Sequence, residues 1–346
     1  MPDLSIIIPT LNEAKNLPAL LDDLSGQQDI HLEILIADGG SDDGTVQIAE
    51  SRGLTVIASD SGRGRQMNRA AGRAHADYLL FLHADSHIQD RRMLHEALKH
   101  LRIEDGDQHL TAGHFPIFFM RSSRRHEVTY RYMEGKSRLN RRHCQNGDQG
   151  LMLHRDFFKK LGGYDESLPF FEDFRIADFI HNQGRWVTLP GRLLTSARRF
   201  EREGLLARYL LMGLIVMAEQ SDIPEFVRQA PGIYDDHDEA GHLLLTPYFR
   251  CFASIARERG WRGTWQALMN IGHLSRLHWW QTFFYFDVLF QLQSRPILRF
   301  YDRRVFPLFA NRLGDGFSAV FAWVVGMWVF RPYFRLREHF ALKALK

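Results

Sequence analysis

The stretch that decides the fold is residues 79–86, with the sequence LLFLHADS. Its four apolar residues, 79–82, predict the end of a buried parallel strand, and His83, Ala84 and Asp85 then leave the strand at its carboxyl edge. Because side chains alternate in an extended segment, His83 and Asp85 point to one side and Ala84 to the other. Open α/β sheets bind ligands at this edge, so the pattern indicates two neighbouring ligand-binding side chains.

The segments around this stretch alternate between strand and helix patterns. Strands are predicted at residues 4–8, 33–38, 54–58, 78–82, 114–120, 150–154 and 186–189. Helices are predicted at residues 14–24, 45–52, 62–72, 91–101, 156–161 and 172–183. Short strands separated by helices imply a mostly parallel α/β sheet with right-handed crossover connections. This domain is expected to end near residue 222.

The last hundred residues differ in composition from the rest of the chain. Residues 247–346 hold 15 Lys and Arg against 5 Asp and Glu, whereas residues 1–246 hold 29 against 36. The same last hundred residues carry 24 of the 43 aromatic residues. An acidic stretch with Pro231 and Gly232 precedes them. We therefore predict an α/β domain at 1–222, a linker at 223–246, and a mainly helical, basic and aromatic-rich region at 247–346.

Cysteine content and apolar run lengths bear on the compartment. Cys144 and Cys251 lie far apart and form no CxxC pair, which indicates neither a disulfide framework nor a thiolate metal site. The N-terminus lacks a basic segment followed by an apolar one, so no secretory signal is expected. The longest uncharged apolar run, residues 317–330, has 14 residues, fewer than the roughly 20 that span a bilayer. We expect a cytoplasmic protein without a membrane-spanning helix.

Four motifs, taken together, resemble a known enzyme family. The series IIIPTLNE at 6–13, ADGGSDDGT at 37–45, LLFLHADS at 79–86 and FFED at 170–173 resembles family 2 glycosyltransferases with the GT-A fold. More narrowly, GRGRQMN at 62–68, NGDQGLMLHR at 146–155 and SARRFEREG at 196–204 are similar to the arsenosugar-biosynthesis-type branch. The resemblance covers residues 4 to about 222. It implies a Rossmann-like, mostly parallel sheet with helices on both faces.

The resemblance also implies a donor site for a nucleotide sugar, with a UDP-sugar as the first expectation. Asp38 would accept a hydrogen bond from the imide N–H of uracil, and Arg63 or Arg65 would face the base or a phosphate. The other implied donor-binding residues follow the first, second and fourth strands: Pro9, Thr10, Asn12, Glu13, Gly39, His83, Ala84 and Asp85. The alternative is that Asp38 only caps its own turn and that the two arginines are solvated.

A divalent metal ion, Mn²⁺ or Mg²⁺, is expected to bridge the oxygens of the donor diphosphate. Asp85 is the predicted ligand. His83 stands where the family usually has the first residue of Asp-x-Asp, and a neutral imidazole suits Mn²⁺ or softer metals better than Mg²⁺. The alternative for His83 is a hydrogen bond to a backbone or sugar oxygen, and for Asp85 a role as a helix cap or turn residue.

Asp173 is the predicted catalytic base, because an inverting transfer needs a carboxylate that takes the proton of the acceptor hydroxyl. The first turn of a helix favours its ionised form. The alternative is that Asp173 only caps that helix. Residues predicted on the acceptor or diphosphate side are Asp148, Gln149, Glu172, Arg198 and Arg199. The QxxRW motif of processive relatives is missing from the sequence, so a non-processive enzyme is expected.

The C-terminal region suggests where the protein works. Residues 279–290 place Trp279, Phe283, Phe286 and Phe290 on one helical face, and the apolar run 317–330 is followed by Arg331, Arg335 and Arg337. Aromatic helices with arginine flanks are typical of interfacial anchors on anionic membranes. A peripheral location on the inner membrane face and a lipid-linked or amphiphilic hydroxyl acceptor would follow.

Two further interpretations of the chain stay open. The aromatic helices also fit the packing of a helical domain or a homodimer interface, because buried aromatic helices look alike in sequence. A catalytically silent, membrane-associated scaffold that binds nucleotide is the alternative function. Nucleic acid is not an expected partner, since no RNP, KH or zinc-finger motif accompanies the basic charge.

Overall fold

The computed structural model describes residues 1–168, 171–235 and 243–344. The chain divides into two compact units, Met1–Ser196 and Ala197–Lys346. This division lies upstream of the predicted boundary at residue 222. The reason is that α8 (Arg198–Glu203) packs on α9 (Leu205–Gln220), and α9 packs on helices further along the second unit. Both helices had been assigned to the α/β domain.

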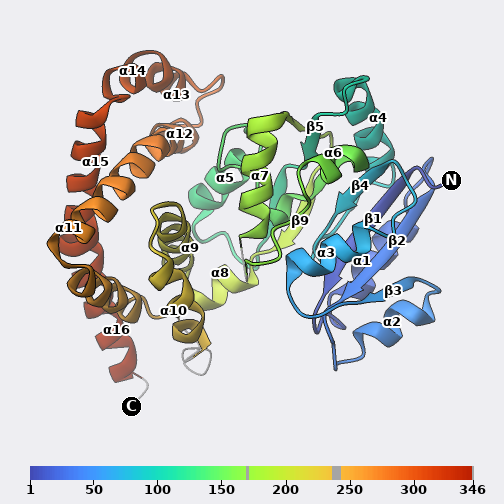
Figure 1. Ribbon diagram of the computed structural model, residues 1–346, viewed down its shortest axis with the longest axis horizontal. Helices are drawn as coiled ribbons and strands as arrows, with labels where there is room; N and C mark the ends of the chain where they lie inside the picture. The colour runs from blue at the N-terminus through green and yellow to red at the C-terminus, as the bar shows by residue number, and fades with distance from the viewer. Residues whose placement is uncertain (169–170, 236–242, 345–346) are drawn as a thin grey trace. The chain divides into compact units, whose positions relative to one another are not determined.

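The first unit is built on a seven-stranded sheet with the strand order β3-β2-β1-β4-β7-β5-β8 (Figure 1). Strand β1 pairs in parallel with β2 and β4, whereas β7 is antiparallel to β4 and β5. The strands are β1 (Leu4–Thr10), β2 (Leu32–Asp38), β3 (Thr55–Ala58), β4 (Tyr78–Phe81), β5 (Thr111–His114), β7 (Leu151–His154) and β8 (Arg185–Thr188). The predicted mostly parallel sheet is confirmed.

The strand predicted at residues 114–120 is instead two strands in different sheets. β5 ends at His114, and β6 (Ile117–Met120) pairs in parallel with β9 (Leu193–Ser196) in a separate two-stranded sheet. Pro116 lies between them and has no backbone N–H to donate to a ladder, so the chain leaves the main sheet there.

Helices cover both faces of the main sheet, as predicted. Helices α1 (Leu17–Ser25), α2 (Thr45–Ser51) and α4 (Met93–Asp105) bury apolar side chains in one core cluster. Helices α3 (Arg63–Ala71), α6 (Arg155–Lys160) and α7 (Glu172–Gln183) do so on the opposite face. Between β6 and β7 lie α5 (Glu127–Lys136) and a short 3₁₀ turn, η1 (Gly147–Gln149).

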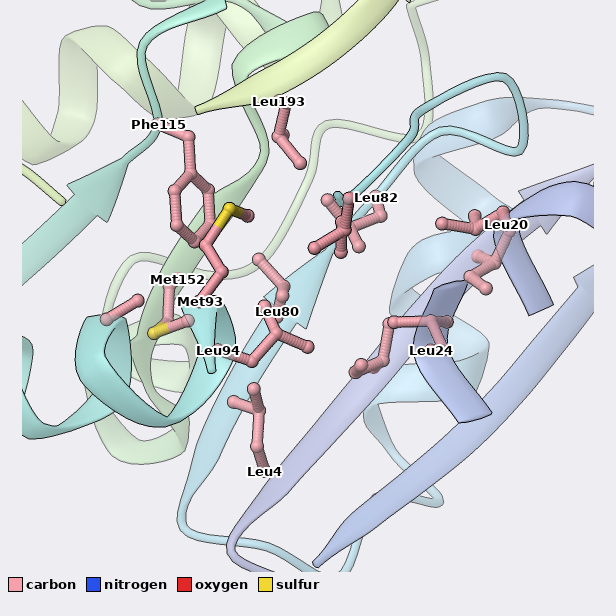
Figure 2. Close-up of a cluster of buried hydrophobic side chains, with 14 of the residues drawn as sticks. Leu4, Leu20, Leu24, Leu80, Leu82, Met93, Leu94, Phe115, Met152 and Leu193 are labelled. Atoms are coloured by element: carbon pink, nitrogen blue, oxygen red, sulfur yellow. The ribbon is translucent and has the colours of Figure 1, made fainter. Parts of the chain in front are cut away.

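Strand β4 and the residue after it supply both core clusters. Leu80 and Leu82 pack with α1 and α4, as Figure 2 shows, while Leu79 and Phe81 enter the cluster formed by α3, α6 and α7. All four side chains are almost completely buried. Since fully burying one such side chain contributes about 1.5–3 kcal/mol, burial on both faces explains the uninterrupted apolar run and fixes where His83 and Asp85 emerge.

The second unit is helical, which confirms the predicted helical C-terminal region. After α8 and α9 come α10 (Pro224–Asp235), α11 (Thr246–His278), α12 (Trp280–Leu289), α13 (Pro296–Phe300), the π-helical segment η3 (Tyr301–Val305), α14 (Phe306–Phe309), α15 (Arg312–Val324), a second π-helical segment η4 (Val325–Phe330) and α16 (Arg331–Ala344). In the predicted linker, α10 buries Phe226 and Ala230 in this unit's core. The acidic residues 236–242 of that linker lie outside the described residues.

One helical stretch in the second unit, Arg312–Phe340, is long and apolar enough to cross a membrane by length and composition. Its most apolar window has a mean hydropathy of 1.5, and 17% of that window is buried. The sequence expectation considered only residues 317–330, because Arg331 ends the uncharged run. The helix itself continues through Arg331 into α16, so the apolar element is longer than that run.

Candidate active site

The predicted donor-binding residues gather at the carboxyl edge of the main sheet. Strand β1 lies between β2 and β4, and the chain crosses from β3 at one side to β4 at the other. Such a reversal of strand order is where open α/β sheets form their ligand crevice. Thr10 and Asp38 end the neighbouring strands β1 and β2 in register, and His83 and Asp85 follow β4.

Asp38 organises the turn that follows β2. One carboxylate oxygen, Oδ1, accepts hydrogen bonds from the hydroxyls of Thr10 at 2.9 Å and Ser41 at 2.6 Å. The other, Oδ2, accepts from the backbone N–H groups of Gly40 and Ser41, both at 2.9 Å. Burial raises the pKa of Asp38, but these hydrogen bonds outweigh it, and the net pKa is lowered. Recognition of a base by Asp38 stays a prediction, and it requires the base to share or replace one of these donors.

Gln66 holds the ends of β1 and β2 together, a role that the sequence did not reveal. Its buried amide nitrogen donates to the carbonyl oxygens of Thr10 at 2.7 Å and Ala37 at 2.8 Å. The side chain also packs against Gly39, where an added Cβ would lie 3.0 Å from Gln66 Cδ. The available signal was helical spacing, which places Gln66 beside Met67 on the buried face of α3, where an amide needs partners.

Asn12 and Glu13 connect the loop after β1 to the loop after β2. Asn12 has a φ of 57°, in the left-handed region that Asn tolerates. Its side-chain oxygen accepts from the backbone N–H of Asp42 at 3.0 Å. The backbone N–H of Glu13 donates to the hydroxyl of Thr45 at 2.9 Å, and its carboxylate accepts from Asn16 at 2.7 Å. These bonds fix the rim of the predicted nucleoside site.

The two predicted arginines at the start of α3 face different surroundings. Arg63 reaches the buried carboxylate of Glu172, with 3.1 Å between Nη1 and Oε1. Desolvation lowers the pKa of Arg63, but the carboxylates of Glu172, Asp173 and Asp148 raise it by more. Arg65 instead lies near the exposed carboxylates of Asp60 and Glu166, at 3.7 and 3.8 Å. Arg63 therefore contributes charge to the pocket, whereas Arg65 forms weak surface pairs.

A pocket next to β4 brings together residues from four segments of the chain. His83 Nδ1 lies 3.2 Å from Asp148 Oδ1, and the backbone N–H of Gly147 donates to Asp173 Oδ2 at 2.7 Å. A Cβ added at Gly147 would lie 2.7 Å from the His83 ring, so only glycine fits there. The pocket is lined by Met67, Phe81, His83, Gln145, Asn146, Gly147, Gly150, Leu151, Tyr164, Glu172, Asp173, Ile176, Ala177 and Trp186.

Adjacent carboxylates at the start of α7 have different environments. Glu172 is 1% exposed, and burial raises its pKa, as Asp173 does, while Arg63 and His83 act in the opposite direction. Asp173 accepts backbone N–H groups on both oxygens, from Gly147 at 2.7 Å and Phe174 at 2.9 Å. Phe171 occupies the N-cap position of α7, so the alternative that Asp173 is the helix N-cap is wrong.

The residues after β4 fit a cation only with help from the substrate. Ala84 is buried in the core, while the half-exposed Asp85 carboxylate has no hydrogen-bond or ionic partner in the described part of the chain. In the same described ranges, no three His, Cys, Asp or Glu side chains are grouped to hold a metal ion. Because Mg²⁺ sites often use one or two carboxylates plus phosphate oxygens and water, Asp85 alone is sufficient. His83 is held by Asp148 and fits less well as a ligand.

The remaining predicted residues have mixed placements. Asp148 lies beside the pocket and contacts His83. Gln149 is 1% exposed and donates its amide N–H to the carbonyl of Cys144, so its side chain supports the turn. Arg198 and Arg199 begin α8 in the second unit. A role for Arg198 and Arg199 at the diphosphate, and for Gln149 at a substrate, stays a prediction.

Comparison with known proteins gives matches concentrated in the first unit. Residues 5–162 match the model described as Glycosyl transferase family 2. A PGL/p-HBAD biosynthesis glycosyltransferase of Mycobacterium bovis is 41% identical over 96 residues, which cover 26% of this chain and 38% of that protein. Succinoglycan biosynthesis protein ExoA of Rhizobium meliloti is 28% identical over 185 residues, covering 49% of this chain and 54% of that protein.

The chain therefore spans less than two thirds of the length of these curated relatives. Among solved structures, S. aureus TarS 1-349 in complex with UDP-GlcNAc aligns with a TM-score of 0.47 and 15% identity. That alignment covers 87% of this chain and 92% of the other. The family match includes His83, Asp85 and Asp148 but ends before Glu172 and Asp173.

Proposed function

Since residues 5–162 make this chain a member of glycosyl transferase family 2, we propose that it transfers a sugar from a nucleotide-sugar donor to an acceptor hydroxyl. The observation that carries the proposal is the Asp173 carboxylate, held at 2.7 Å by the backbone N–H of Gly147 in a pocket next to β4. A carboxylate fixed in this way is pre-positioned to accept a proton. Membership of the arsenosugar-type branch is a narrower proposal that rests on the three motifs quoted for it.

The donor is a UDP-sugar in this proposal. The nucleoside would lie beyond Thr10 and Gly39, where the loops after β1 and β2 are joined by side-chain hydrogen bonds to backbone groups. The diphosphate would lie beyond β4, near Asp85, with Arg63 as the nearby cation. The choice of uracil rests on the resemblance of the motifs around Asp38, since its carboxylate already accepts four hydrogen bonds.

The reaction is a single displacement. Asp173 takes the proton of the acceptor hydroxyl as the acceptor oxygen forms its bond to the anomeric carbon. The bond from that carbon to the diphosphate oxygen breaks, and the nucleoside diphosphate leaves with the electron pair. One displacement from the opposite face inverts the anomeric configuration. Without a processive signature in the sequence, one sugar is added for each encounter with the acceptor.

Two groups near β4 would handle the charge of the leaving diphosphate. A divalent cation, Mn²⁺ or Mg²⁺, held by Asp85 and by diphosphate oxygens, supplies Lewis-acid stabilisation when bound. Arg63 carries a fixed positive charge beside Glu172 at 3.1 Å. The hydrogen bond from His83 to Asp148 orients the imidazole within the pocket. These residues orient the donor, while Asp173 handles the proton.

The test replaces the base without removing its shape. Asp173→Asn should lower kcat by about 10²–10⁴-fold, the usual contribution of general base catalysis, and leave UDP binding unchanged. Asp156→Asn is the matched control, because Asp156 also lies in the first turn of a helix but is 72% exposed on its side chain. Unchanged turnover in Asp173→Asn would remove Asp173 from this role.

A screen for the donor separates enzyme from scaffold. Thermal shift with a panel of nucleotide sugars, each with Mn²⁺ or Mg²⁺, identifies ligands because binding to the folded state raises the melting temperature. The proposal expects one donor that both shifts the melting temperature and is consumed with an acceptor. A wild-type protein that binds nucleotide but consumes no donor would favour the catalytically silent scaffold.

A further inference from the structure

Exposed apolar side chains are concentrated in the second unit. Among the described residues, 22 of the 26 large apolar side chains that are exposed belong to residues 197–346, and four belong to the first unit. Soluble proteins rarely keep large contiguous apolar surfaces exposed, so a concentration of this kind marks an interaction surface.

Half of this exposure belongs to one long helical stretch, made of α15, η4 and α16 (Figure 1). Its exposed residues recur three or four positions apart in α15, which places them along one side of the helix. The exposed fraction is 59% for Phe317, 56% for Phe321 and 70% for Trp328. We call this side the outer stripe, and it consists of Leu313, Phe317, Val320, Phe321, Trp323, Val324, Trp328, Val329, Tyr333, Leu336 and Phe340.

The opposite side of α15 is made of small residues packed on α11. Gly314, Ser318 and Ala319 are the buried residues of α15. On α11, a Cβ added at Gly272 would overlap the main-chain oxygen of Asp315 and lie 2.7 Å from Ala319 Cβ. Small residues at the helix contact and large apolar residues outside reverse the pattern of helices in water, and they are typical of helix pairs in lipid.

Positive charge borders the outer stripe. Arg312 begins α15, and Arg331 and Arg335 follow the apolar segment η4 in α16. None of these three guanidinium groups pairs with a carboxylate in the portion of the chain that the structure describes. Arg335 also lines a surface pocket with Arg250 and His339, at the end of the stripe. Unpaired arginines beside an apolar surface complement anionic lipid head groups.

We propose that the outer stripe inserts into the surface of an anionic lipid bilayer, with α15 and α16 lying along the interface. The uncharged segment 317–330 is 14 residues long, about 21 Å of helix, whereas the hydrocarbon core is about 30 Å thick. On its inner side α15 carries the ion pair between Asp315 and Arg276 of α11, with 2.6 Å between Oδ1 and Nε. The helix therefore lies on the bilayer without crossing it. This surface is independent of whether the first unit transfers a sugar.

Vesicle flotation of the full-length protein tests the stripe. The wild type should float with vesicles of phosphatidylcholine and phosphatidylglycerol. Phe321→Glu with Trp328→Glu should reduce partitioning by about tenfold or more, because each buried aromatic contributes a factor of that order. The matched control is Ile103→Glu, which changes a residue that is 72% exposed in the first unit and should partition as the wild type does. Equal flotation of the stripe variant and wild type would overturn the proposal.

Charge is tested separately. Arg331→Gln with Arg335→Gln should weaken binding to these vesicles by about twenty-fold, at about fivefold for each arginine, and raised salt should do the same. Arg91→Gln with Arg124→Gln removes the same charge from exposed positions of the first unit and should have no effect. Binding that is equal on pure phosphatidylcholine would contradict the anionic requirement.

Two other occupants of the stripe give distinct results. Alkaline carbonate should release the protein from vesicles, and retention in the membrane pellet would show a spanning helix instead. A stable dimer by light scattering that fails to bind vesicles would show a second copy of the chain on this surface. UDP binding and the circular dichroism spectrum of each variant report whether the protein is folded, so lost flotation in a folded variant is informative. Failure of the proposed sugar transfer would leave these flotation results unchanged.

Discussion

Asp38→Ala should loosen the carboxyl edge of the sheet, because it removes a carboxylate that is 5% exposed and accepts four hydrogen bonds. The hydroxyl of Thr10 is buried and loses its acceptor, which costs about 1–3 kcal/mol. The hydroxyl of Ser41 and the N–H groups of Gly40 and Ser41 are partly exposed and can turn to water, so each adds about 0.5 kcal/mol. The expected local loss is about 3 kcal/mol.

Asp38→Asn separates shape from charge. The amide oxygen can accept the N–H groups of Gly40 and Ser41, while its NH₂ donates to the hydroxyl oxygens of Thr10 and Ser41. Only the charge assistance of these bonds is lost, which amounts to about 1 kcal/mol. The pKa of Asp38 is lowered, so its charged form stabilises the fold above pH 3.8, and this contribution is lost as pH falls through the folded-state pKa. The difference between wild type and Asp38→Asn should therefore shrink below pH 3.8.

Hydrogen exchange measured by mass spectrometry provides the assay, because it reports local opening in a chain with two units. Peptides covering residues 4–10 and 32–38 should exchange about a hundredfold faster in Asp38→Ala and about fivefold faster in Asp38→Asn. Asp42→Ala is the matched control, because Asp42 lies in the same loop and is exposed. Protection within about threefold of wild type in Asp38→Ala would refute the argument that the turn depends on this carboxylate.

Three other substitutions test neighbouring parts of the site. Gln66→Ala should weaken UDP binding and lower stability by about 1–2 kcal/mol, since it frees two buried carbonyls, as calorimetry and urea unfolding would show. Gly147→Ala should reduce kcat at least tenfold with little change in melting temperature, because its Cβ would displace the His83 ring. In Glu172 the pKa is raised, so its contribution to stability is greatest below pH 4.5 and falls as pH rises through the folded-state pKa. Glu172→Gln should remove this fall in urea midpoints measured across that range.

The sequence predicted the family and the main sheet well, for a physical reason. The four motifs sit where strands end, and the strands of a parallel sheet are apolar on both faces, so their position could be found from composition alone. The match to family 2 confirms the family prediction. Two features depended on contacts that composition does not contain: the break at Pro116 into separate sheets, and the packing of α8 and α9 with the second unit.

Site residues at strand ends could be predicted, but their partners could not. Arg63 meets Glu172 across 109 residues, and His83 meets Asp148 across 65. Such pairs depend on tertiary geometry, which local periodicity does not encode. Gln66 was missed for the related reason that its function is to bond backbone carbonyls of β1 and β2, and backbone groups carry no sequence signal.

The neighbouring carboxylates of α7 show how one local rule leads to two chemical roles. Helical geometry turns successive side chains about 100° apart, so Glu172 faces the interior and Arg63, while Asp173 faces the backbone of Gly147. Burial raises the pKa of Glu172, and its ion pair places a positive charge in the pocket. Asp173 has two backbone N–H groups that fix its orientation, and each oxygen retains a lone pair for an incoming proton. Charge balance therefore falls to Glu172, which leaves Asp173 as the carboxylate available to the acceptor.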